Sequence, residues 1–243
     1  MADPAPTGLS VSGRVVVLAG GTSAAGRAIA RALLASGARV VIVGSHRDKL
    51  EAVESALREA QGPEAGVHTE LCDLTSEPEV IALAQRVRGR FGRVDGLIHL
   101  VGGWRGGGGL AGQSDEDYRA LEAGLTALRH STRAFDADLR ASDAGRLAIV
   151  SSTAVARPLA GGANYAAVKA ASEAWTRAVG QGFAKAARDA GSELSGAVVI
   201  FRVKALEGLE EELAASVVAL WAQPATDLNE SVIPLVVNAS QTQ

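Results

Sequence analysis

Cysteine is nearly absent from this chain of 243 residues, in which Cys72 is the only one. A single thiol excludes a disulfide within the chain and weakly favours a reducing compartment. We interpret Cys72 as a small buried apolar residue. Histidine is also scarce, and the histidines at positions 46, 68, 99 and 130 show no metal-ligand spacing beside a cysteine or carboxylate cluster. We therefore expect no metal site.

Long apolar runs and runs of one charge are also missing. No apolar run approaches the roughly 20 residues that span a bilayer, so we expect no membrane association. The 24 basic and 27 acidic residues are interspersed and give a net charge of −3, which argues against a nucleic-acid surface. Residues 1–14 have no apolar core, so we expect no signal peptide. The single cysteine favours a cytoplasmic location. Because no Pro/Ser-rich linker divides the sequence, we predict a single domain over residues 1–243.

What the sequence does contain is a regular alternation of strand-like and helix-like segments. Because the strand-like runs are apolar on both faces and alternate with helices, the sequence predicts an α/β, doubly wound Rossmann fold. Its sheet would be seven-stranded and mainly parallel, with helices on both faces, and ligands would bind beyond the carboxyl ends of the strands. The predicted strands are 14–19, 39–43, 67–71, 94–101, 146–151, 196–203 and 231–238, and the predicted helices are 24–36, 46–60, 76–91, 114–140, 164–190 and 206–222.

The turn after the first predicted strand is rich in glycine. Gly20 permits a tight turn, and Gly26 lets the following helix pack close to the sheet. Backbone N–H groups at such a helix start can hold a pyrophosphate, which predicts a dinucleotide site. A simple tight turn is the alternative. The candidate cofactor contacts of this turn are Gly20, Thr22, Ser23, Ala24, Ala25 and Gly26.

The end of the second strand bears on the choice of dinucleotide. NAD-selective sites usually place an acidic residue there, and this chain has Gly44. Ser45, His46 and Arg47 instead offer hydrogen-bond donors and positive charge, which suit a 2′-phosphate. We therefore expect NADP(H) to be preferred, with NAD(H) possible; a solvated cation at a helix start is the alternative. Asp73 follows the third strand and can contact the adenine amino group, cap the next helix, or do both. The remaining candidate cofactor contacts are Leu74, Val101, Gly102, Tyr165 and Lys169.

The strongest chemical signal is a tyrosine and a lysine four residues apart. Tyr165 and Lys169 share one face of a predicted helix, and a nearby cation stabilises a phenolate. The tyrosine can then donate a proton to a carbonyl oxygen as hydride arrives, or take one from an alcohol. Ser152, at the end of the fifth strand, can hydrogen-bond the same oxygen. A Tyr–Lys pair at this spacing often occurs by chance, but its combination with the serine and the glycine-rich turn favours catalysis.

Together these residues resemble the short-chain dehydrogenase/reductase family over nearly the whole chain. The match is carried by the 20–26 turn, Asp73-Leu74, Asp95, Ser151-Ser152 and the segment 164–169 (NYAAVK). The resemblance implies that Tyr165 is the general acid/base, that Lys169 contacts the ribose and assists the phenol, and that Ser152 orients the substrate. Together with the NADP(H) preference indicated by residues 44–47, it predicts an oxidoreductase that interconverts a carbonyl and an alcohol by hydride transfer.

Several departures from the family limit what carries over. Ala24 replaces the middle glycine of the turn, and Gly124 occupies the place of the family's helix asparagine, which holds a proton-relay water. His99 begins the segment that replaces Asn-Asn-Ala-Gly, where we expect it to serve packing or hydrogen bonding. After the sixth strand, residues 201–208 lack both the Pro-Gly turn and the substrate loop. The alternative function is therefore a non-catalytic or weakly active relative that binds dinucleotide as a sensor or scaffold subunit.

Two further expectations concern the substrate and the assembly. In the glycine-rich loop 102–109, Trp104 can stack on a small-molecule substrate and Arg105 can meet an anionic group; a mobile surface loop is the alternative. The predicted helices 114–140 and 164–190 carry apolar residues beyond one stripe, which favours a homodimer or homotetramer through them. Examples are Leu121, Leu125, Leu128, Val168, Trp175 and Val179.

Overall fold

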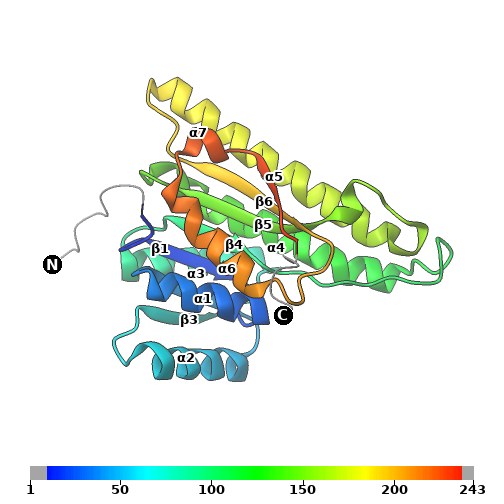
Figure 1. Ribbon diagram of the computed structural model, residues 1–243, viewed down its shortest axis with the longest axis horizontal. Helices are drawn as coiled ribbons and strands as arrows, with labels where there is room; N and C mark the ends of the chain where they lie inside the picture. The colour runs from blue at the N-terminus through cyan, green and yellow to red at the C-terminus, as the bar shows by residue number, and fades with distance from the viewer. Residues whose placement is uncertain (1–9, 237–243) are drawn as a thin grey trace, which may run out of the picture.

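The computed structural model describes residues 10–236, and its strands form one parallel sheet with the order β3-β2-β1-β4-β5-β6-β7 (Figure 1). The strand order reverses between β1 and β4, which is where open sheets of this kind bind ligands. The predicted doubly wound fold is therefore confirmed. The strands are β1 (Val15–Ala19), β2 (Arg39–Gly44), β3 (Val67–Leu71), β4 (Gly96–His99), β5 (Arg146–Ser152), β6 (Ala197–Val203) and β7 (Ser231–Pro234).

Helices cover both faces of the sheet, because successive strand residues point to opposite sides. In β1, Val16 and Leu18 pack in one apolar core with α1, α2 and α6, whereas Val15 and Val17 pack in a second core with α3, α4 and Phe183 of α5. In Figure 1, α1 and α6 lie side by side on the first of these faces. The helices are α1 (Ala24–Ala35), α2 (Arg47–Gln61), α3 (Glu77–Phe91), α4 (Asp115–Ala141), α5 (Ala163–Ala190), α6 (Glu210–Ala219) and α7 (Ala225–Leu228).

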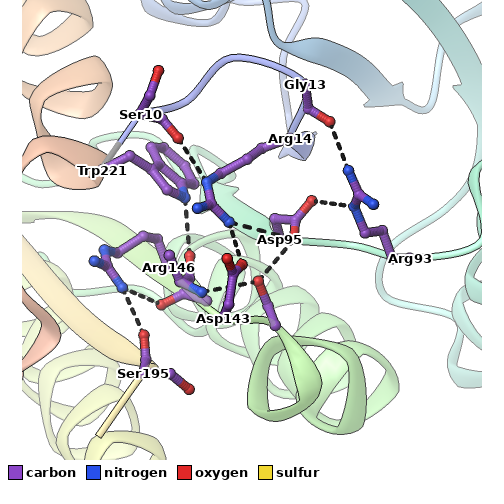
Figure 2. Close-up of polar contacts among 12 residues, drawn as sticks. Ser10, Gly13, Arg14, Arg93, Asp95, Asp143, Arg146, Ser195 and Trp221 are labelled. Atoms are coloured by element: carbon purple, nitrogen blue, oxygen red, sulfur yellow. Dashed lines mark hydrogen bonds and ion pairs between the residues drawn. The ribbon is translucent and has the colours of Figure 1, made fainter. Parts of the chain in front are cut away.

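Charged side chains fasten the amino ends of the central strands (Figure 2). The buried Asp95 carboxylate, which directly precedes β4, accepts hydrogen bonds from the backbone of Val15 (2.9 Å) and from Arg93 (3.1 Å). Arg14 forms an ion pair with Asp143 at 2.6 Å. Buried Arg146 donates only to backbone carbonyls in the contacts found for it, including that of Leu220 at 2.8 Å. This cluster therefore joins β1, β4, β5 and the end of α6 away from the carboxyl edge of the sheet.

The element boundaries depart from the sequence prediction where turns intervene. The helix predicted over 206–222 begins only at Glu210, because Gly208 has a left-handed φ of 79° in the turn before it. It ends in a 3-10 turn, Leu220–Ala222, and the short α7 was not predicted. The last strand ends at Pro234, directly after which the Leu235 N–H still donates to the Arg202 carbonyl of β6 at 3.0 Å; positions 237 and 238 of the prediction lie outside the described residues. Within residues 10–236, no helix combines the length and the apolar character needed to cross a membrane.

Candidate active site

A cavity of about 1310 Å³ lies at the carboxyl edge of the sheet. The segments that follow β1, β4, β5 and β6 form its walls, and α5 closes one side. Ser152, Tyr165 and Lys169 all line it, so the structure brings the three predicted catalytic residues to one space. Of the predicted cofactor and substrate contacts, it is also lined by Ser23, Ala24, Ala25, Val101, Gly102 and Trp104.

The tyrosine and the lysine lie one turn apart near the start of α5. The Lys169 Nζ atom is 5.8 Å from the centre of the Tyr165 ring and donates a hydrogen bond to the Val150 carbonyl at 2.8 Å. Burial lowers the pKa of Lys169 to about 8, and the negative charge of Glu173 works in the opposite direction. The ammonium is thus held beside the phenol, with a proton that it can exchange close to neutral pH.

The serine is fixed by the turn that it caps. Ser152 ends β5, is 4% exposed, and its Oγ accepts a hydrogen bond from the Ala154 backbone at 3.2 Å. This bond starts the 3-10 turn Thr153–Val155. Because a hydroxyl can accept two hydrogen bonds and donate one, the Ser152 hydrogen remains able to reach an oxygen in the cavity.

Two positions of the glycine-rich turn favour glycine, one because of its backbone conformation and the other because of a close contact. Gly20 has a left-handed φ of +81°, and a Cβ atom at Gly26 would lie 2.3 Å from the Gly21 carbonyl oxygen. Ser23 caps α1 by accepting a hydrogen bond from the Gly26 N–H at 3.1 Å. The turn therefore brings the start of α1 directly against the sheet, and the exposed Ala24 faces the cavity in place of a middle glycine.

A second cavity of about 830 Å³ adjoins the first and shares Ser23, Leu100, Val101 and Gly102 with it. It is lined by the predicted contacts Gly20, Thr22, Ser45, Asp73 and Leu74. Residues of the glycine-rich turn line both cavities, which places the turn where a pyrophosphate would link the two halves of a dinucleotide.

The positive charges of the second cavity are not the ones that the sequence indicated. Arg27 and Lys49 line it, whereas His46 and Arg47 are exposed at the start of α2 and are not among its lining residues. His46 instead contacts Ser45, with its Nδ1 3.0 Å from the Ser45 Oγ. Both new residues lie within the first turn of a helix, Arg27 in α1 and Lys49 in α2. The sequence alone does not single out Arg27 or Lys49, because their relation to the cavity depends on which side of each helix faces it.

Asp73 lines this cavity and also orders the turn before α3. Its carboxylate accepts hydrogen bonds from the Thr75 hydroxyl (2.7 Å) and backbone (2.9 Å), and these bonds lower the pKa of Asp73. Ser76, not Asp73, occupies the N-cap position of α3. Asp73 thus faces the cavity while stabilising the turn, and it is not the helix cap.

Trp104 and Arg105, the two predicted substrate contacts, separate in the structure. Trp104 lines the larger cavity with its side chain 63% exposed. Arg105 is not among the lining residues, and its Nε lies 3.6 Å from the Asp117 carboxylate. The far side of the loop is attached to the segment before α5, since the Gly107 N–H donates to the Gly161 carbonyl at 2.7 Å.

His99 and Gly124 meet at the end of β4. His99 is 6% exposed, and its Nε2 lies 3.1 Å from the Gly124 carbonyl oxygen. Burial, reinforced by the charge of Lys169, lowers the pKa of His99 to about 3. A Cβ atom at Gly124 would lie 3.1 Å from the Val101 carbonyl oxygen, so glycine allows α4 to approach the strand end closely. His99 therefore acts as a neutral hydrogen-bonding residue, as its expected packing role requires.

Comparison with known proteins supports the same family. A family profile described as short chain dehydrogenase matches residues 14–187. Levodione reductase of Leifsonia aquatica is 39% identical over 89 residues, which are 37% of this chain and 33% of that protein. The 2,3-dihydro-2,3-dihydroxybenzoate dehydrogenase of Bacillus subtilis is 27% identical over 171 residues, 70% of this chain and 64% of that protein. The matched stretches thus span less than two thirds of either relative's length.

Solved structures agree in fold. A metagenomic short-chain oxidoreductase in complex with NADP has a TM-score of 0.78 and 27% identity, covering 93% of this chain and 99% of its own. A short-chain oxidoreductase from Pseudomonas aeruginosa PAO1, described as containing an atypical catalytic center, has a TM-score of 0.81 over 96% of this chain and all of its own. At 22% identity it shows the fold alone. With the profile match, the sheet order and the cavity-lining serine, tyrosine and lysine all in agreement, the chain belongs to the short-chain dehydrogenase/reductase family of oxidoreductases.

Proposed function

We propose that this chain is an NADP(H)-dependent oxidoreductase that interconverts a carbonyl and an alcohol, with Tyr165 as the general acid/base. The observation that carries the proposal is that Ser152, Tyr165 and Lys169 line one cavity together with the glycine-rich turn. A protein that only binds dinucleotide has no chemical need for these three side chains in the same space.

In the proposed reaction, a bound nicotinamide supplies or accepts the hydride. Tyr165 gives its phenolic proton to the carbonyl oxygen during reduction and takes it back during oxidation. Ser152 donates a hydrogen bond to the same oxygen and stabilises its developing charge. Lys169, with its pKa lowered to about 8 by burial, stabilises the phenolate and can return a proton to it near neutral pH.

The cofactor preference rests on the second cavity. The turn at 20–26 would hold the pyrophosphate, with the start of α1 directed at it. Ser45, Arg27 and Lys49 line the space beyond, and Gly44 brings no carboxylate to the end of β2. Two cations and a hydroxyl favour a 2′-phosphate, which supports NADP(H) over NAD(H). The 27% identical neighbour that was crystallised with NADP is consistent with this preference.

The proposed partners are a small-molecule substrate and a second copy of the chain. The loop after β6 contributes Lys204, Ala205 and Leu206 to the substrate side of the cavity. The support for a homodimer or homotetramer through α4 and α5 is smaller than the sequence indicated, because some of the apolar residues concerned are buried within the chain. Leu121, Leu128 and Val168 are buried, whereas Leu125, Trp175 and Val179 are half-buried.

Turnover and cofactor binding, measured separately, test the proposed reaction. Purified protein is assayed for NADPH consumption with a panel of aldehydes and ketones, and for NADPH binding by nucleotide fluorescence. Tyr165→Phe is expected to lower turnover at least about a thousandfold, consistent with loss of the proton donor, while NADPH binding changes little. Tyr118→Phe is the matched control, because Tyr118 is the only other tyrosine and is not among the cavity-lining residues.

The same assay decides between the reductase and the sensor or scaffold alternative. Full activity in Tyr165→Phe would refute the mechanism. NADPH binding without turnover on the whole panel would favour the non-catalytic alternative, to which the glycine at 124 and the missing Pro-Gly turn also point.

A further inference from the structure

A buried carboxylate lies behind the proposed catalytic pair. Glu173 follows Lys169 by four residues on α5, so the two share one face of the helix. Its side chain is 1% exposed. Neither the sequence motifs nor the proposed reaction uses this residue, and acidic side chains are almost never fully buried unless they are paired.

The Glu173 carboxylate joins three elements. Its Oε1 accepts hydrogen bonds from the Ser151 hydroxyl of β5 at 2.7 Å and from the Arg202 Nε of β6 at 3.1 Å. Its Oε2 accepts from Arg202 Nη2 at 2.7 Å and from Arg177 Nη2, one turn further along α5, at 3.0 Å. Burial by itself would raise the pKa of Glu173, but these hydrogen bonds outweigh it and hold the pKa below its usual value. The group is therefore an anion at neutral pH.

An anion in this place has an effect that a neutral link would not have. Isolated buried charges are costly, and a serine or amide could also have joined β5, β6 and α5. What the carboxylate adds is an electric field on the ammonium one turn away. Burial lowers the pKa of Lys169, and the negative charge of Glu173 counteracts this by raising it.

The other groups around Lys169 do not replace this anion. From β4 it faces the neutral His99 and from α5 the Tyr165 ring, while Arg157 after β5 and Lys204 after β6 bring further cations to the cavity. The elements β5 and α4 add Ser151, Ser152 and the uncharged residues Gly124, Leu125 and Leu128. Glu207 and Glu210 also line the cavity, but the carboxylate that raises the pKa of Lys169 is that of Glu173, which is buried against β5 and β6.

We propose that Glu173 is a positioning residue for the reaction: its carboxylate fixes the end of β5 next to Ser152 and keeps Lys169 in its charged form beside Tyr165. It touches neither substrate nor cofactor and acts through the lysine. The inference rests on the proposed function for its meaning in catalysis, but its electrostatic part can be measured without any substrate.

The charge state of Lys169 can be followed directly, because the chain has only four lysines. Protein labelled with ¹³C at the lysine ε-carbon is titrated by NMR, and the Lys169 signal is identified by its loss in Lys169→Met. The parent signal is expected to titrate near pH 8. Glu173→Gln keeps the shape and removes the charge, so the midpoint should fall by about one pH unit or more.

Arg202→Gln is the matched variant with the opposite expected sign. It breaks the two hydrogen bonds from Arg202 to Glu173 and removes a cation, so the field of the carboxylate is less compensated and the midpoint should rise. A purely structural link predicts that both variants behave alike. Equal displacement in the two variants, or an unmoved midpoint in either folded variant, would overturn the proposal. If Glu173→Gln does not fold, Arg202→Gln decides alone.

The consequence for catalysis is a separate measurement. With the best carbonyl of the panel, the alkaline limb of the NADPH-dependent rate should move to lower pH in Glu173→Gln and to higher pH in Arg202→Gln. If the NMR midpoints move as expected but no carbonyl is reduced by the parent, the proposed function fails while the assignment of Glu173 to Lys169 stands. If the parent reduces carbonyls but the NMR midpoints do not move, the proposed function stands and the assignment of Glu173 to Lys169 fails.

Discussion

At the scale of single residues, the proposed preference for NADP(H) depends on the two cations that line the second cavity. If Arg27 and Lys49 bind a 2′-phosphate, Lys49→Met should weaken NADPH binding about tenfold, which corresponds to about 1.4 kcal/mol, and leave NADH binding nearly unchanged. Arg27→Met should act in the same direction. The measurement is the pair of dissociation constants for NADPH and NADH.

Arg47→Met is the control for this prediction, because Arg47 lies outside the cavity lining although the sequence indicated it. A larger loss of NADPH affinity in Arg47→Met than in Lys49→Met would contradict the structural assignment. Clear preference of the parent for NADH would contradict the NADP(H) proposal itself.

Some residues of the candidate site could be predicted from the sequence and others could not. Gly20, Gly26, Ser152, Tyr165 and Lys169 could be predicted, because strand ends and helical spacing place them without knowledge of tertiary contacts. Arg27, Lys49, Glu173 and Arg202 could not. Their relation to the site depends on which face each helix turns to the sheet, and on pairs separated in sequence such as Glu173 and Arg202.

At the scale of elements, the Gln113 side chain is one of the groups that attach the glycine-rich loop to its neighbours. The Gln113 amide donates to the carbonyls of Gly107 and Gly161, both at 3.1 Å, and its oxygen accepts from the Asn164 backbone at 3.1 Å. Gln113 thus joins the loop that carries Trp104 to the start of α5. The sequence shows a loop here, but it does not show that the loop is attached.

Gln113→Ala should therefore loosen the wall of the substrate cavity. Each lost hydrogen bond contributes about 1 kcal/mol, so we expect KM for the carbonyl to rise about tenfold, while NADPH affinity changes less. Arg105→Ala is the comparison, since it removes only the ion pair of the loop with Asp117 and leaves the Gln113 hydrogen bonds in place, so its effect on KM should be smaller. Steady-state kinetics with both variants would count against a tethered wall if KM stayed at the parent value in Gln113→Ala.

At the scale of the whole molecule, stability should depend on pH through His99. Burial lowers the pKa of this imidazole to about 3, below the unfolded value of about 6.5. Between these two pKa values, His99 binds a proton in the unfolded chain but not in the folded chain. The folded state therefore loses stability as the pH falls from about 6.5 towards 3. Between pH 7 and 4.5 this group accounts for about 2 to 3 kcal/mol of lost stability.

Urea unfolding of the parent and of His99→Asn at these two pH values measures this contribution. The variant should be less stable than the parent at pH 7 but should lose about 2 to 3 kcal/mol less on acidification. An identical acid-induced loss in both proteins would show that His99 is not the group responsible.

The two ends of the sheet have different tasks. The amino ends of β1, β4 and β5 are held by Asp95, Arg14 and Arg146, while the cavities open among the loops at the opposite edge. Substitutions in those loops leave the fastening untouched. Within these loops, Gly106 and Gly112 leave no space for a side chain and Leu209 is part of the core, so substitutions that spare such positions should alter the cavity walls while the fold persists.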